Sequence, residues 1–166
     1  LLLLLLLLLL LLLLLLLLGA TMRSYLLEGG DAVSVEYLQE HGIEYMQMPM
    51  EEYAPVLEEL CEKKGYKNRD EVRLTPETEG LEDKLKIFFN EHLHEDEEIR
   101  FVLDGRGVFD IRDRDDAWVR IEVEKGDLII VPANMYHRFT LMEEKFIHAM
   151  RLFTENPKWV AIPRHP

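Results

Sequence analysis

Apolar and polar residues follow two different periods along this chain, and the change falls near residue 90. Before it, apolar residues recur at the spacing of amphipathic helices, bounded by capping and stop signals. The expected helices run from Ser34 to Gly42, from about 50 to Gly65, and from Pro76 to about 89, the last with Leu81, Leu85, Phe88 and Phe89 on its inner face. A short apolar strand is expected over 43–48. We therefore predict a mainly helical part over about 34–89 that covers one side of a sheet.

Beyond residue 90 apolar and polar residues alternate with the period of two that a half-buried strand shows, and turn signals follow at short intervals. The expected strands cover about 99–103, 108–111, 118–123, 128–131, 136–141 and 146–153. Asp104-Gly105-Arg106-Gly107 is expected to form a hairpin turn between the first two. Many short strands with frequent turns are typical of an antiparallel barrel or sandwich. We predict a small β-barrel over about 90–160.

Residues 1–18 are a leucine homopolymer. Its length is at the lower limit of a membrane span. Natural spans and signal peptides, however, vary their residues and carry basic flanks or cleavage sites, whereas only Gly19 and Ala20 follow here. We interpret the tract as an artefact or an unassigned segment, with a membrane anchor as the minority alternative. Residues 19–166 have the length of one domain, and a single domain is expected there.

The chain carries 32 acidic and 19 basic residues, a formal net charge of −13 at pH 7. This charge repels phosphates and anionic headgroups, so neither nucleic acid nor a membrane surface is expected as a partner. The single cysteine, Cys61, can form no intrachain disulfide, which is typical of the reducing cytoplasm. Cys61 falls on the apolar face of a predicted helix, so we interpret it as a buried hydrophobe rather than a nucleophile.

Four residues have the types and the order of a mononuclear metal site: His92, His94, Glu98 and His137. Side chains two positions apart on an extended segment point to the same face, so the first two histidines face the same way and Glu98 shares their parity. His137 follows a buried strand and a turn, and is expected to reach the metal from the opposite side of the barrel. Three imidazoles and a carboxylate suit divalent iron, nickel, zinc or copper, with positions left for substrate or oxygen.

The spacing of these residues resembles the two cupin motifs. His-x-His-x3-Glu-x6-Gly begins at His92, and Gly-x5-Pro-x4-His ends at His137. The strings EHLHEDEEIRFVLDGRGVFDIRD and EKGDLIIVPANMYHRF are similar to acireductone dioxygenases of the methionine salvage pathway, and the similarity covers about 35–159. The resemblance implies a mostly β fold with N-terminal helices, a cupin-type antiparallel β-barrel (double-stranded β-helix or jelly roll) with the helices packed on one side.

Three positions depart from the general cupin pattern. Lys86 and Asn134 stand where glycines are usual, and Leu141 replaces an asparagine. Asparagine tolerates the left-handed conformation that glycine would supply, so we expect the change at Asn134 to be harmless.

The resemblance also implies an activity. Acireductone dioxygenases cleave 1,2-dihydroxy-3-keto-5-methylthiopentene (acireductone) with O2, using one Fe2+ or Ni2+ per chain. The iron form yields formate and 4-methylthio-2-oxobutanoate, and the nickel form yields formate, carbon monoxide and 3-methylthiopropionate. A monomer is expected, in the cytoplasm and with the nucleus as a second location.

The resemblance places Arg100, Arg151, Phe88 and Phe139 around the substrate. Arg100 has the parity of Glu98, so its guanidinium is expected to face the site and stabilise oxyanion charge. A buried Arg151 needs a partner, which would be either the anionic substrate or an acidic side chain in an internal salt bridge. The two phenylalanines are expected to exclude water, with a plain core role as the alternative.

Two other functions stay open. The same four ligands would serve another metal-dependent cupin oxygenase or isomerase. They would also serve a non-catalytic cupin that binds metal as an interaction module. The helical N-terminal part argues against the first, and a ligand set that leaves coordination positions free argues against the second.

Overall fold

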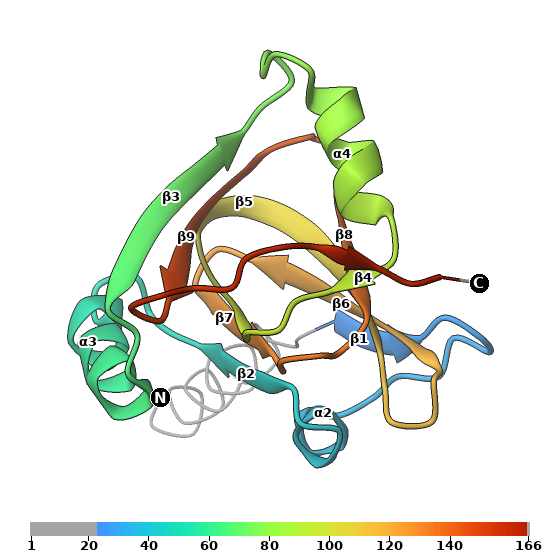
Figure 1. Ribbon diagram of the computed structural model, residues 1–166, viewed down its shortest axis with the longest axis horizontal. Coiled ribbons are helices and arrows are strands. Elements are labelled where there is room, and N and C mark those ends of the chain that lie inside the picture. Colours follow the sequence, from blue (N-terminus) through green and yellow to red (C-terminus); the bar gives the residue numbers. More distant parts are fainter. Residues whose placement is uncertain (1–22, 166) are drawn as a thin grey trace, which may run out of the picture.

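A computed structural model describes residues 23–165 as two antiparallel sheets that share one long strand, β5 (Glu98–Arg112) (Figure 1). One sheet has the order β1-β6-β5-β8-β4-β10, and the other the order β2-β7-β5-β9-β3. The remaining elements are β1 (Arg23–Leu26), α2 (Val35–Glu40), β2 (Glu44–Gln47), α3 (Tyr53–Lys64), β3 (Asn68–Leu74), α4 (Leu81–Phe89), β4 (His92–Leu93), β6 (Trp118–Glu124), β7 (Asp127–Val131), β8 (His137–Leu141), β9 (Ile147–Phe153) and β10 (Ile162–Pro163). Among these residues the outer strands do not pair with one another, so the sheets stay open rather than closing into a ring.

Strand β5 continues without reversal through the segment for which we predicted a hairpin turn. Its register against β9 shifts between Val102 and Asp104, and Gly105 adopts a φ of 77°. This is a β-bulge, which bends a strand and changes the parity of the side chains that follow. Arg100 lines the interior before the bulge, and Phe109 does so after it. The predicted hairpin is therefore wrong: the glycine-containing segment bends β5 from one sheet into the other instead of reversing the chain.

The first two predicted helices are present, and the third starts later than predicted. The Ser34 hydroxyl accepts a hydrogen bond from the Tyr37 N–H at 3.2 Å and caps α2, and Gly65 ends α3 with a φ of 76°. Helix α4 begins at Leu81 and not at Pro76. Residues 75–80 instead form hydrogen-bonded turns, and Gly80 has a left-handed φ of 67° that interrupts a helix begun at Pro76.

The segment 34–89 is less helical than predicted. Strand β2 confirms the short strand expected there, but β3 was not expected and pairs with β9 along seven residues. Its sequence, NRDEVRL, buries only Leu74 fully and is rich in charged residues. Such composition is common on edge strands, where it discourages pairing with other chains, and it hides the alternation by which strands are predicted.

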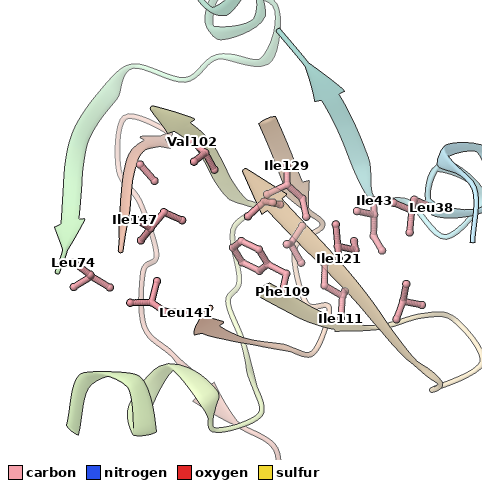
Figure 2. Packing of buried hydrophobic residues seen from close by; sticks show 14 of the residues in the cluster. Leu38, Ile43, Leu74, Val102, Phe109, Ile111, Ile121, Ile129, Leu141 and Ile147 are labelled. Atoms are coloured by element: carbon pink, nitrogen blue, oxygen red, sulfur yellow. The ribbon is translucent and has the colours of Figure 1, made fainter. Parts of the chain in front are cut away.

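Apolar side chains pack on both faces of the sheet that contains β3 and β9. The inner cluster lies between the two sheets, and Figure 2 shows Val102, Phe109, Ile129 and Ile147 within it. A second cluster joins the outer face of the sheet to α3 and includes Cys61. Cys61 is 4% exposed, and burial raises the pKa of its thiol, so its interpretation as a buried hydrophobe is confirmed.

Helix α4 buries part of the face predicted for it. Leu81 is buried, while Leu85 and Phe88 pack against the inner cluster. Phe89 is 41% exposed, and the Arg138 guanidinium lies 4.2 Å from the centre of its ring. The placement of Phe89 on the inner face is therefore wrong, because α4 rotates that ring toward the outer surface of β8.

None of the helices within residues 23–165 is long and apolar enough to cross a membrane. The leucine tract of residues 1–18, and with it our interpretation of that tract, lies outside the described residues.

Asp110 on β5 is expected to be important for stability. Its carboxylate is 1% exposed and accepts hydrogen bonds from Nε of Arg120 at 2.7 Å and Nε of Arg138 at 2.8 Å. Asp110→Asn removes the charge that both guanidinium groups share, and we expect a loss of about 3 kcal/mol in urea unfolding. Glu122→Gln is the control, because its partner Arg23 is 70% exposed, and should cost less than about 1 kcal/mol. Equal losses would contradict the assignment.

Asp127 is expected to make stability depend on pH. Burial raises the pKa of Asp127 to about 6, although the Tyr45 hydroxyl and the Glu124 N–H donate to it. The folded protein therefore holds this proton more tightly than the unfolded chain, in which the pKa of an aspartate is about 3.9. The contribution of protonated Asp127 to the free energy of unfolding is thus full below pH about 4 and is lost as pH rises through 6. The unfolding free energy of the wild type minus that of Asp127→Asn should fall by on the order of 2 to 3 kcal/mol between pH 4 and 7. A constant difference would refute this.

Candidate metal centre

The four predicted ligands meet at one end of the space between the sheets. His92 lies on β4, His94 follows two residues later, Glu98 starts β5 and His137 starts β8. One nitrogen or oxygen of each lies within 4.8 Å of the others. His137 stands directly opposite His92 in the β4–β8 ladder. The expectation that His137 approaches from the far side of a barrel is therefore wrong, because β8 and β4 are neighbours in an open sheet.

Each histidine is oriented by a hydrogen bond between its Nδ1 and a backbone carbonyl oxygen. The pairs are His92 with Asn90 (2.7 Å), His94 with Val160 (3.0 Å) and His137 with Met135 (2.8 Å). A carbonyl oxygen only accepts, so in each ring Nδ1 carries a hydrogen and Nε2 is the nitrogen that can bind an ion once it has no proton. Backbone carbonyls orient metal-binding histidines in this way.

Glu98 supplies the negative charge of the centre. One carboxylate oxygen lies 3.3 Å from Nε2 of His94 and 3.0 Å from Nε2 of His137, and the other lies 3.1 Å from Arg100. Burial opposes ionisation, but Arg100 and His137 outweigh it and hold the pKa of Glu98 well below its usual range. Burial also lowers the pKa of His92, which favours its neutral form. Together these residues form a metal-binding site, with three imidazole nitrogens and an anionic oxygen as donors.

A loop conformation predicted from the sequence supports His137. Asn134 precedes this histidine by three residues and adopts a φ of 63°, and its N–H donates to the His94 carbonyl oxygen at 2.8 Å. Asparagine thus takes the left-handed conformation of the glycine it replaces, and the loop connects the backbones of two of the ligands.

A cavity of about 190 Å³ opens beside the metal-binding residues, and all four of the other predicted site residues line it. Arg100 is 12% exposed and reaches it next to Glu98, and Arg151 lies opposite Arg100 in the β5–β9 ladder. Phe88 and Phe139 contribute to its apolar wall. The rest of that wall includes Val72, Leu74, Val102, Phe109, Ile147 and Ala149. The cavity therefore has a charged end at the metal ligands and an apolar remainder.

Arg151 has the acidic partner that we considered as an alternative. Its Nε donates to Asp70 at 2.6 Å and its terminal NH2 donates to the other carboxylate oxygen at 2.5 Å. Asp70 lies on β3, the strand that was not expected, directly opposite Arg151. The hydrogen bonds with Arg151 lower the pKa of Asp70. Arg151 thus pairs with an acidic side chain and also lines the cavity, but the pair is not internal, because the two side chains are 29% and 49% exposed.

A segment beyond β9 contributes a residue that sequence reasoning missed. Trp159 stacks on the ring of His94, with 4.0 Å between centroids, and the Arg100 guanidinium lies 4.8 Å from its ring centre. The segment is held by the Lys158 N–H, which donates to Asp96 at 2.7 Å, and by the antiparallel pairing of β10 with β4. A tryptophan in a polar stretch was the only sequence signal.

Comparisons with known proteins agree with this site and fold. The model of the ARD/ARD′ family matches residues 27–161. The acireductone dioxygenase of Heterostelium pallidum is 62% identical over 144 residues, which cover 87% of this chain and 99% of that protein. The acireductone dioxygenase of Dictyostelium discoideum is 63% identical over 147 residues, with 87% and 100% covered.

A solved structure is similar along nearly its whole length. It is an acireductone dioxygenase from Bacillus anthracis with a cadmium ion in its active center, 27% identical, with a TM-score of 0.79 and coverage of 86% of this chain and 99% of that one. This likeness confirms the predicted mostly β, cupin-type fold, although the chain has fewer helical residues than predicted and the sheet is open rather than closed.

From the geometry of the site we predict that the protein binds one divalent ion per chain. Dialysis against Ni2+ followed by metal analysis should give a ratio of about one, and Ni2+ at 100 times its Kd should stabilise the fold by about 2.7 kcal/mol. His94→Ala should abolish both effects. The control is His148→Ala, since His148 pairs with Glu71 outside the cluster. Undiminished binding by His94→Ala, or its loss in His148→Ala, would show that the ion lies elsewhere.

Proposed function

The chain belongs to the ARD/ARD′ family of acireductone dioxygenases, and we propose that it cleaves 1,2-dihydroxy-3-keto-5-methylthiopentene with O2 in methionine salvage. The observation that carries the proposal is the convergence of His92, His94, Glu98 and His137 at the charged end of a cavity that is otherwise apolar. That arrangement suits a small anion with an apolar tail, which describes this substrate in its enediolate form.

The bound ion is proposed to be Fe2+ or Ni2+, since both fit this donor set. When bound, it supplies a Lewis acid and a template for two substrate oxygens. Cleavage to formate and 4-methylthio-2-oxobutanoate, proposed for the iron form, uses both atoms of O2. The products proposed for the nickel form, which are formate, carbon monoxide and 3-methylthiopropionate, together contain the same atoms as the products of the iron form. The two outcomes therefore differ only in which carbon–carbon bonds break, and neither needs a further reductant.

Arg100 is proposed to bind substrate oxygens. Its guanidinium touches Glu98 on one side, lies against the ring of Trp159 and lines the cavity with 12% of its side chain exposed. Burial lowers the pKa of Arg100, which means that its charge is only partly compensated by Glu98. An enediolate in the cavity would add the missing negative charge through charge-assisted hydrogen bonds, the strongest kind.

Arg151 is proposed to add a second positive charge beside the substrate. Asp70 holds its guanidinium by two hydrogen bonds, which leaves other N–H groups for a ligand. Phe88, Phe139 and Trp159 are proposed to exclude water from the reacting oxygens. Exclusion of water strengthens the attraction between the arginines and the enediolate, because it lowers the local dielectric.

The setting proposed for the protein follows from its composition and its relatives. A net charge of −13 and one buried cysteine agree with a cytoplasmic enzyme, with the nucleus as a second location. Acireductone and O2 are its proposed partners, with no role for nucleic acid or a membrane, and the working form is proposed to be a monomer with one metal. Light scattering of the metal-loaded protein tests the last point.

Aerobic turnover of acireductone tests the reaction. Separately loaded iron and nickel proteins should both consume O2 and substrate, with keto acid and formate from the first and carbon monoxide from the second, measured by chromatography and gas analysis. His94→Ala should form neither set. Stoichiometric metal without turnover in either form would refute the proposed function.

Arg100→Ala tests the substrate-binding role. We expect the kcat/KM of this variant to fall roughly 10- to 100-fold, the range for partners next to a metal site, with metal content near that of the wild type. Arg23→Ala is the matched control, because Arg23 is 70% exposed and lies on the edge strand β1. Loss of the metal along with activity would reassign Arg100 to holding Glu98.

A further inference from the structure

We infer that Gly107 sets the length of apolar tail that the cavity accepts, because it gives the ring of Phe139 its place. The inference deepens the proposed function, since it concerns the part of the cavity that would hold the substrate's methylthioethyl tail. Gly107 lies on β5 and Phe139 on the neighbouring β8.

The ring of Phe139 lies directly against the backbone of Gly107. A Cβ atom at residue 107 would come within 2.6 Å of both Cε2 and Cζ of the Phe139 ring and 3.1 Å of Cδ1 of Ile147. Carbon atoms in contact are normally about 3.5 to 4.0 Å apart. The space that a side chain would fill at residue 107 is therefore already taken by the aromatic ring.

Backbone conformation does not explain this glycine. Gly105, two residues earlier, has a φ of 77°, but Gly107 is outside the left-handed region and pairs regularly with Leu141 and Val123. Glycine inside a strand is unfavourable by roughly 0.5 to 1 kcal/mol relative to alanine, and it often marks close approach of another group. The close approach here is that of Phe139.

Phe139 lines the apolar part of the cavity. On β8 it follows His137 by two residues, so both side chains point to the same face, and both line the cavity. Phe109, opposite Phe139 in the ladder, has its ring centre 5.0 Å away and closes one side. Ile147 closes another. A ring displaced from Gly107 therefore moves into the cavity, which is the open direction.

The test compares Gly107→Ala with the wild type on acireductone and on an analogue whose tail lacks the methylthio group. We expect kcat/KM for the full substrate to fall roughly 10- to 200-fold, the effect of one misfitting group in an apolar pocket, and kcat/KM for the short analogue to stay within about 3-fold. The double variant Gly107→Ala/Phe139→Leu should recover much of the loss for the full substrate, because the smaller side chain clears the new methyl group. Equal losses for both substrates, with no recovery in the double variant, would overturn the inference.

A binding measurement separates this inference from the proposed reaction. Straight-chain carboxylates from propionate to heptanoate would be titrated calorimetrically into nickel-loaded protein. Affinity should rise with chain length up to a limit, and the limit should come at a shorter chain in Gly107→Ala than in the wild type, whether or not either protein turns over acireductone. The same limit in both proteins would overturn the inference, while thermal melts and metal content establish that the variant is folded.

Discussion

Strand β5 pairs with four other strands, two in each sheet, and so joins the two sheets. Its bulge lies where the strand passes from one sheet to the other. The strand enters with Glu98 and Arg100 facing inward, and after the bulge it presents Phe109 to the same interior. Without the extra residue the alternation would turn one half of these side chains to the outside. The metal ligand and the apolar wall therefore share one cavity because β5 changes parity where it changes sheet.

The buried charge of Glu98 is a second constraint on the structure, beside the bulge of β5. A buried carboxylate is costly unless it is paired, and Glu98 is paired with Arg100 and with two imidazoles. The imidazoles in turn are fixed by carbonyl oxygens from three separate backbone segments, one of them at Val160 near the C-terminus. The positions of the donor atoms thus depend on loops as much as on strands.

Much of the site followed from sequence because its information is local. Parity and spacing grouped the four ligands, and the left-handed turn at Asn134 followed from residue type. The sequence failed where the outcome depends on distant partners. The same glycine-containing sequence is compatible with a hairpin turn and with a β-bulge, and only the pairing of β5 with β9 decides between them. Strand β3 was missed for the same reason, and so were Asp70 on it and Trp159, which reach the site through tertiary contacts.

The two ends of the cavity are built from successive inward positions of the same strands. On β8, His137 serves the metal, and Phe139 serves the apolar wall. On β5, Glu98 and Arg100 carry charge, whereas Gly107 lies beyond the bulge, next to Phe139 and Ile147 of the apolar wall. The bulge separates Gly107 from Glu98 and Arg100 along β5, whereas Phe139 lies two residues from His137 on β8. Under the proposed function, residues of β5 before the bulge serve the reaction, and Gly107 after the bulge serves the choice of substrate size.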